Sequence, residues 1–262
     1  ISAVAVRTHQ LWLLYAGYGL IGGIGLGLGY IAPVSTLMKW FPDRPGMATG
    51  MAIMGFGSGA LIGSPLAEVY AEEGHDVRVL TRSLPDGDAR HDPGTGKPGI
   101  TRVGWNADGA SGPWATVVEA ADAVVNLSGE SLAAKRWSVE AKKQLRESRL
   151  LATRSLAMAI RGAASPPAVL VSGSAVGFYG PADSRAITEA DPAGSDFLAE
   201  LCVDWEREAQ QAERPGTRVV LLRTGVVLER SGGALLEMMR PFKFFVGGPI
   251  GSGRQYVSWI HR

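Results

Sequence analysis

A glycine-rich stretch in the first quarter of the chain has residue types that suit binding of a charged small molecule. Gly55-x-Gly57-x-x-Ala60 fits the Gly-x-Gly-x-x-Gly/Ala pattern. In that pattern small residues let the backbone approach a pyrophosphate, and the next helix points its amino end at the phosphates. Residues 52–54 suit the preceding strand, with the helix beginning near Ile62. Glycines four residues apart are also typical of packed membrane helices, so the stretch predicts either a phosphate loop or part of a membrane span.

Arg82 favours the nucleotide interpretation. It lies 19 residues after Gly63, at the end of a strand predicted over residues 77–81. This separation is close to the roughly 20 residues at which the adenosine ribose is recognised in dinucleotide-binding folds. A cation there suits a 2′-phosphate, so we expect NADP(H) in preference to NAD(H). The alternative is a solvated arginine at a strand end.

Strands and helices alternate from residue 68 onward. Apolar runs predict strands over residues 77–81, 121–127, 168–172 and 218–222. Helices are predicted over residues 139–162, with Ser138 as the N-cap, and over residues 196–213. Apolar strands that alternate with helices indicate a parallel sheet covered on both faces. We therefore expect an α/β fold, a Rossmann-like doubly wound parallel sheet, as an NAD(P)-binding domain over residues 50–262.

The first part of the chain has a different composition. Residues 1–65 contain only four charged residues, whereas the remainder has the charge density of an ordinary soluble domain. The uncharged runs 11–38 and 45–67 both exceed the roughly 20 residues that cross a bilayer core. We expect a Gly-rich apolar helical segment over residues 1–49, with residues 11–38 as a candidate membrane contact. A buried core segment is the alternative.

Residues 11–67, and "KWFPDRPGMATG" within them most specifically, resemble the fourth and fifth helices of major-facilitator transporters of the oxalate/formate antiporter type. Substrate sites of such transporters lie between repeats, so one helical hairpin is not expected to transport. The resemblance implies a chimera in which this hairpin precedes the nucleotide domain. Because the chain begins at Ile1 and stops at Arg262, directly after Trp-Ile-His, we also expect a fragment truncated at its carboxyl end.

Residues 66–262 contain "GHDVRVLTR", "ADAVVNLSGESLAAKRW", "VLVSGSAVGFYG" and "VVLLRTGVVLERSGGAL" in this order. With these motifs the segment resembles the NAD-dependent epimerase family of extended short-chain dehydrogenases/reductases, in its sugar-nucleotide-epimerase-like branch. The resemblance implies a nucleotide cofactor, a small-molecule substrate and a cytoplasmic location for the Rossmann domain.

The resemblance also implies which residues bind the cofactor. They follow the strands, where open α/β sheets bind ligands, and they include the phosphate loop aligned on Ile62-Gly63. The middle glycine of that loop is replaced by Ala60, which we expect to weaken binding. The cofactor set is Gly57, Ala60, Ile62, Gly63, Arg82, Asn126, Leu127, Ser128, Gly129, Glu130, Arg223 and Thr224. Asn126 has an alternative role in fixing a turn, and Arg223 has one in an ion pair.

The catalytic residues depart from the family pattern. Hydride-transferring members use a Tyr that exchanges a proton and a Lys four residues later, and Phe197 and Leu201 occupy these positions. The resemblance places the hydroxyls of Ser172 and Ser174 near the substrate, with helix capping as their alternative. It leaves Tyr179 as a substitute acid, and it implies substrate contacts in a glycine-rich loop at Arg254 and Gln255.

Composition excludes several other functions. A net charge of +1 argues against a nucleic-acid binder. The four histidines are scattered without metal-ligand spacing, and Cys202 suits a buried thiol, so no metal site is expected. We therefore expect an epimerase-like or oxidoreductase-like protein that binds NAD(P), with a non-catalytic NADP-binding module or a transporter fragment as alternatives. The sequence does not specify the substrate or the oligomeric state.

Overall fold

The computed structural model describes residues 58–82, 99–119, 121–132, 137–182, 184–229, 232–245, 247–248, 253 and 256–261. Several predicted features lie outside these residues. They are Gly57, the strand at residues 52–54, most of the transporter-like segment, and the substrate contacts Arg254 and Gln255.

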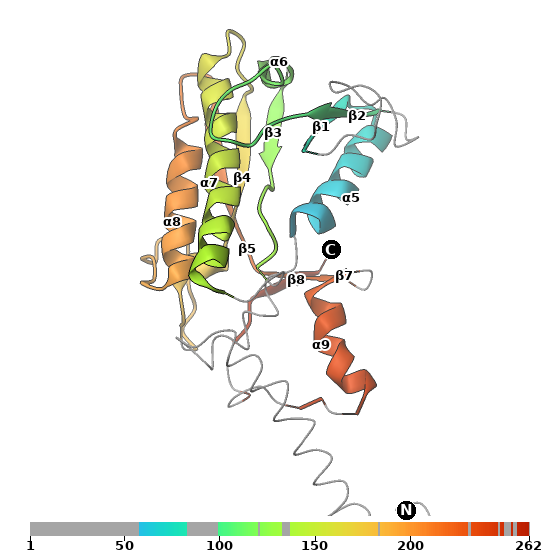
Figure 1. Cartoon of the computed structure of the whole chain (residues 1–262), viewed down its shortest axis with the longest axis vertical. Helices are drawn as coiled ribbons and strands as arrows, with labels where there is room; N and C mark the ends of the chain where they lie inside the picture. The colour runs from blue at the N-terminus through green and yellow to red at the C-terminus, as the bar shows by residue number, and fades with distance from the viewer. Residues whose placement is uncertain are drawn as a thin grey trace, which may run out of the picture.

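Helices and strands alternate along the described chain (Figure 1). In chain order they are α5 (Ser58–Glu72), β1 (Val77–Thr81), β2 (Ile100–Gly104), α6 (Ala115–Glu119), β3 (Ala123–Asn126), α7 (Val139–Gly162), β4 (Val169–Ala175), the 3₁₀ turn η2 (Val176–Tyr179), α8 (Phe197–Gln210), β5 (Arg218–Thr224), β6 (Val226–Glu229), β7 (Gly232–Gly233), α9 (Ala234–Lys243) and β8 (Trp259–His261).

The strands that precede Val226 pair in parallel. β1 pairs with β2, and β4 pairs with β3 on one side and β5 on the other. The register places Asn126 beside Ser172 and Ser174 beside Arg223. Figure 1 shows α7 and α8 side by side along the sheet formed by β3, β4 and β5. This is an α/β Rossmann-like fold, which confirms the predicted fold class.

Element boundaries follow local chemistry. α7 covers the predicted residues, and the Ser138 hydroxyl accepts a hydrogen bond from the backbone N–H of Ala141 at 3.2 Å, as an N-cap should. At the other end of α7, Arg214 Nη1 donates to three carbonyl oxygens, of Ile160, Arg161 and Ala163. The helix is therefore fixed at both ends.

α5 begins earlier than predicted, at Ser58 and not near Ile62. Ala60, Ile62 and Gly63 consequently lie inside the helix. A Cβ atom at Gly63 would lie 3.7 Å from Leu127 Cδ1, so α5 packs against the segment after β3 at this point. Residues 58–63, the described part of the segment that the sequence predicted as either a phosphate loop or a membrane span, thus belong to a helix of the α/β fold. No helix in the described part of the chain combines the length and apolarity that crossing a membrane requires.

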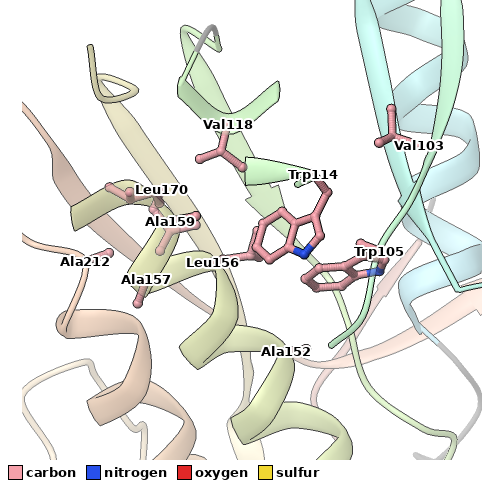
Figure 2. Packing of buried hydrophobic residues seen from close by; sticks show 11 residues of the cluster. Val103, Trp105, Trp114, Val118, Ala152, Leu156, Ala157, Ala159, Leu170 and Ala212 are labelled. Atoms are coloured by element: carbon pink, nitrogen blue, oxygen red, sulfur yellow. The ribbon is translucent and has the colours of Figure 1, made fainter. Parts of the chain in front are cut away.

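The main hydrophobic core lies between the sheet and its helices (Figure 2). Trp105 and Trp114 meet edge to face with ring centroids 5.2 Å apart. They pack with the buried stripe of α7 that includes Ala152, Leu156 and Ile160. Burial of such side chains is the dominant favourable contribution to folding, and this core holds α7 rigidly against the strands that carry the site.

Candidate functional site

A cavity opens at the carboxyl ends of β3, β4 and β5, and we call it the cleft. The segments that follow these strands line it with residues 127–130, 174–177 and 224–227. Leu132 and helix residues complete the lining, namely Arg149, Leu198, Leu201, Cys202, Trp205 and Ala234. Ligands of open α/β sheets bind at such strand ends. A second hollow, the outer groove, lies between α7 and α8 and shares no residue with the cleft.

A buried polar network fixes the loop that follows β3, residues 127–130. Asn126 is almost fully buried and donates to Thr153 Oγ1 at 2.8 Å and to Ser172 Oγ at 3.3 Å. Its side-chain oxygen accepts from the backbone N–H of Ser128 at 3.1 Å. Asn126 therefore points into the core and holds the loop in shape.

The far end of the same loop is fixed by α7. The backbone N–H of Glu130 donates to Ser148 Oγ at 3.1 Å, and the Glu130 carbonyl accepts from Arg149 Nη2 at 2.9 Å. A Cβ atom at Gly129 would come within 3.0 Å of Arg149 Cζ, so a larger residue would displace the guanidinium. Residues 127–130 thus present a preorganised backbone to the cleft.

The two serines of β4 have different surroundings. Ser172 is fully buried, and its hydroxyl belongs to the Asn126 network. Ser174 lines the cleft and donates to Glu206 Oε1 at 2.6 Å. Because a carboxylate only accepts hydrogen bonds, the Ser174 proton points to Glu206, and its oxygen can accept a hydrogen bond from the cleft.

Glu206 forms a bidentate ion pair with Arg223. Arg223 Nε and Nη2 lie 2.8 Å from Oε1 and Oε2 of Glu206. Hydrogen bonding to Glu206 raises the pKa of the Arg223 guanidinium further above its ordinary value. Arg223 also donates to the Tyr179 hydroxyl at 2.9 Å, and its guanidinium carbon lies 3.4 Å from the Phe178 ring centroid. Neither Arg223 nor Tyr179 is among the described lining residues of the cleft.

Phe197 and Leu201, which occupy the positions of the family's Tyr-Lys pair, form an apolar wall. Phe197 opens α8, and its ring meets Trp137 edge to face with centroids 5.7 Å apart. Lys142 Nζ lies 5.2 Å from the Phe197 ring centroid. Leu201 is buried and lines the cleft. Neither Phe197 nor Leu201 can exchange a proton.

Cys202 is a buried core thiol that is also among the residues lining the cleft. The pKa of its thiol is raised to about 11, mainly by burial. The Glu206 charge contributes to this rise, whereas the Arg149 charge opposes it. The thiol is therefore protonated at neutral pH.

The remaining predicted residues lie at two places. Thr224 lines the cleft, and its hydroxyl donates to the Ser174 carbonyl at 3.2 Å. Arg82 is exposed at the end of β1 and does not line the cleft. The structure thus brings together residues 126–130, Ser174 and Thr224, and it places Arg82 on a different strand end.

Sequence reasoning missed Arg149 and Glu206. Both lie on apolar faces of their helices, one turn after the buried residues Leu145 and Cys202 respectively. A charged residue in an apolar helical stripe is a signal that could have identified them, because such a charge needs a partner or a function.

The cleft can now be compared with known proteins. Residues 56–229 match the model of the NAD dependent epimerase/dehydratase family. The chain belongs to this family. It is 42% identical over 206 residues to Epimerase family protein Mb2239 of Mycobacterium bovis, covering 78% of this chain and 63% of that protein. It is 39% identical over 213 residues to the chloroplastic SDR39U1 homolog of Arabidopsis thaliana, covering 80% of this chain and 59% of the relative.

A similar solved structure is human epimerase family protein SDR39U1 with NADPH. The TM-score is 0.63 at 36% sequence identity, and the match covers 76% of this chain and 62% of the human chain. This family member therefore spans less than two thirds of the length of these relatives. The epimerase family, which the sequence motifs predicted, is confirmed.

Proposed function

We propose that the chain binds NADP(H) in the cleft and acts as an epimerase-like oxidoreductase on a small molecule. The observation that carries this proposal is the cavity at three parallel strand ends with its preorganised loop at residues 127–130. The NADPH in the human relative supports the choice of cofactor.

The cofactor fits the residues present in three places. The backbone of residues 127–130 and the Thr224 segment would line its path through the cleft. The amino end of α5, with Ala60, Ile62 and Gly63, would face its phosphates, because a helix amino end attracts anions. Gly57 and Arg82 stay predictions for the phosphate loop and the 2′-phosphate. When bound, the nicotinamide ring supplies hydride transfer.

We propose Ser174 as the polar group that contacts the substrate. With its proton directed to Glu206, its oxygen accepts a hydrogen bond from a substrate hydroxyl. In place of the substrate-facing role expected for Ser172, we propose that Ser172 and Asn126 position the loop. Tyr179 is held by Arg223 away from the described lining of the cleft, which favours a positioning role over that of an acid.

A non-catalytic NADP-binding module is the second candidate. The apolar wall formed by Phe197 and Leu201 favours it, since general acid–base catalysis contributes about 10²–10⁴-fold to rates. Binding of NADPH without turnover of nucleotide sugars or simple carbonyl compounds would favour the module. Turnover of either class of compound by the wild type would favour the enzyme.

The test of cofactor choice is a titration of the chain with NADPH and with NADH, for wild type and Arg82→Ala. A charge-assisted contact to the 2′-phosphate is worth about 1.5–3 kcal/mol, or roughly tenfold to a hundredfold in affinity. We expect tighter NADPH binding in the wild type and equal affinities in the variant. Equal affinities in the wild type contradict the role of Arg82.

A further inference from the structure

The cleft contains a cation, Arg149, that no described carboxylate neutralises. Arg149 lines the cleft, and its Nη1 and Nη2 donate to the carbonyls of Leu145 and Glu130 at 3.0 and 2.9 Å. Among the described residues no carboxylate forms an ion pair with it. The Glu130 side chain attracts it only at longer range.

The surroundings of Arg149 make its positive charge energetically unfavourable. Its guanidinium lies beneath Gly129 and 5.4 Å from the Trp205 ring centroid. Burial lowers the pKa of the guanidinium below its ordinary value. A half-buried charge without a counter-ion loses hydration that the two backbone carbonyls replace only in part. Two backbone carbonyls use only part of the five N–H donors of an arginine.

We propose that Arg149 is an anion-binding residue of the cleft, which takes a phosphate or carboxylate oxygen of the bound ligand. The proposal rests on the proposed function, because it assumes that the cleft binds a ligand. Two sources of the anion share this chemistry: the pyrophosphate of the cofactor and an acidic group of the substrate.

The decisive variant is Arg149→Gln, with Arg149→Lys to keep the charge. Arg154→Gln is the matched control, because Arg154 lies on the same helix but pairs with Glu208 at the outer groove. Thermal unfolding without ligand shows whether each variant folds. We measure the affinity of each variant for NADPH and for inorganic pyrophosphate, and the affinity of its NADPH complex for malonate, a small dicarboxylate.

The expected result is a tenfold to hundredfold loss for Arg149→Gln, partial recovery with Arg149→Lys and no change for Arg154→Gln. A loss for NADPH and pyrophosphate assigns the anion to the cofactor. A loss confined to malonate assigns it to the substrate. If folded Arg149→Gln binds all three as the wild type does, Arg149 is structural and the proposal is wrong. If the wild type binds pyrophosphate but not NADPH, the proposed function fails while the Arg149 result still stands.

If Arg149→Gln fails to fold, Arg149→Lys decides. An affinity for NADPH or malonate that is lowered in Arg149→Lys, with unchanged unfolding temperature, supports the proposal. An unchanged affinity in that variant overturns it, because lysine does not reproduce the planar donor geometry that arginine offers to an oxyanion.

Discussion

α7 and α8 each place one charged side chain on their buried face, and the two charges have different partners. Glu206 on α8 forms a bidentate ion pair with Arg223 and also accepts a hydrogen bond from the Ser174 hydroxyl. Arg149 on α7 contacts two backbone carbonyls and forms no ion pair among the described residues. Both side chains lie close to one cavity, whose lining includes Arg149 and Ser174.

This difference indicates that the Glu206–Arg223 pair is structural, whereas Arg149 belongs to the surface of the cleft. A buried pair with good geometry offsets its own desolvation, and removing one partner is strongly destabilising. Glu206 and Arg223 therefore hold β4, β5, η2 and α8 together behind Ser174. Arg149 fixes the loop after β3 to α7 only through a backbone carbonyl, and we propose that its remaining N–H donors bind a ligand. The following predictions test this contrast.

Glu206→Leu should have the largest effect, because it leaves the half-buried Arg223 without its carboxylate partner and removes the acceptor of the Ser174 hydroxyl. We expect a loss of about 3–5 kcal/mol in the free energy of unfolding, measured by urea denaturation. The double variant Glu206→Leu with Arg223→Met should recover part of the loss. A change below about 1 kcal/mol would show that the pair is not structural.

The reactivity of Cys202 depends on both charges, because Glu206 raises the pKa of its thiol and Arg149 lowers it. With a pKa of about 11, the thiol at pH 8 should have roughly a hundredfold less thiolate than an ordinary cysteine and react correspondingly slowly with iodoacetamide. The reaction rate should rise as pH approaches 11. Arg149→Gln should slow the reaction further, and Glu206→Gln should accelerate it.

The same pKa shift has a consequence for stability. The folded-state pKa is raised above the unfolded value, so the neutral thiol is favoured in the folded chain. This contribution is fully present below the unfolded pKa of about 8.5 and is lost as pH rises through 11. Rapid alkylation of the native chain at pH 7.5 would contradict a buried, protonated Cys202.

Asn126→Ala should have a smaller effect on stability, about 1–3 kcal/mol, because it removes the bonds to Thr153 and Ser128 and leaves buried groups unpaired. It should also lower NADPH affinity, since the loop beside Arg149 loses its support. Ser172→Ala removes only the 3.3 Å contact and serves as the milder control. An Asn126→Ala chain with unchanged NADPH affinity would show that the loop does not form the binding surface.

Much of the fold followed from local pattern. The apolar runs marked the parallel strands, and Ser138 marked the start of α7. Because parallel strands end at the same edge, the sequence also predicted that Asn126, Ser174 and Thr224 lie together. The depth of each side chain was not predictable in this way. Asn126 and Ser172 point into the core because α7 supplies Thr153 opposite them.

The helix-borne part of the site depends on tertiary pairing. Arg149 and Glu206 reach the cleft from α7 and α8, and no local pattern states which strand end each helix faces. The start of α5 was also predicted too late, because Gly59 is a weak helix former in isolation and the residues before Ile62 fit a phosphate-loop pattern. Packing against β1 and Leu127 favours the helix there.

The most direct test of the account is hydrogen exchange of the whole chain with and without saturating NADPH. The account predicts slower exchange at residues 127–130, 174–177 and 224–227, which line the cleft. It predicts unchanged exchange at the outer groove, near Arg161 and Gln211. Protection confined to the outer groove, or no protection anywhere at saturating NADPH, would contradict the assignment of the cleft as the cofactor site.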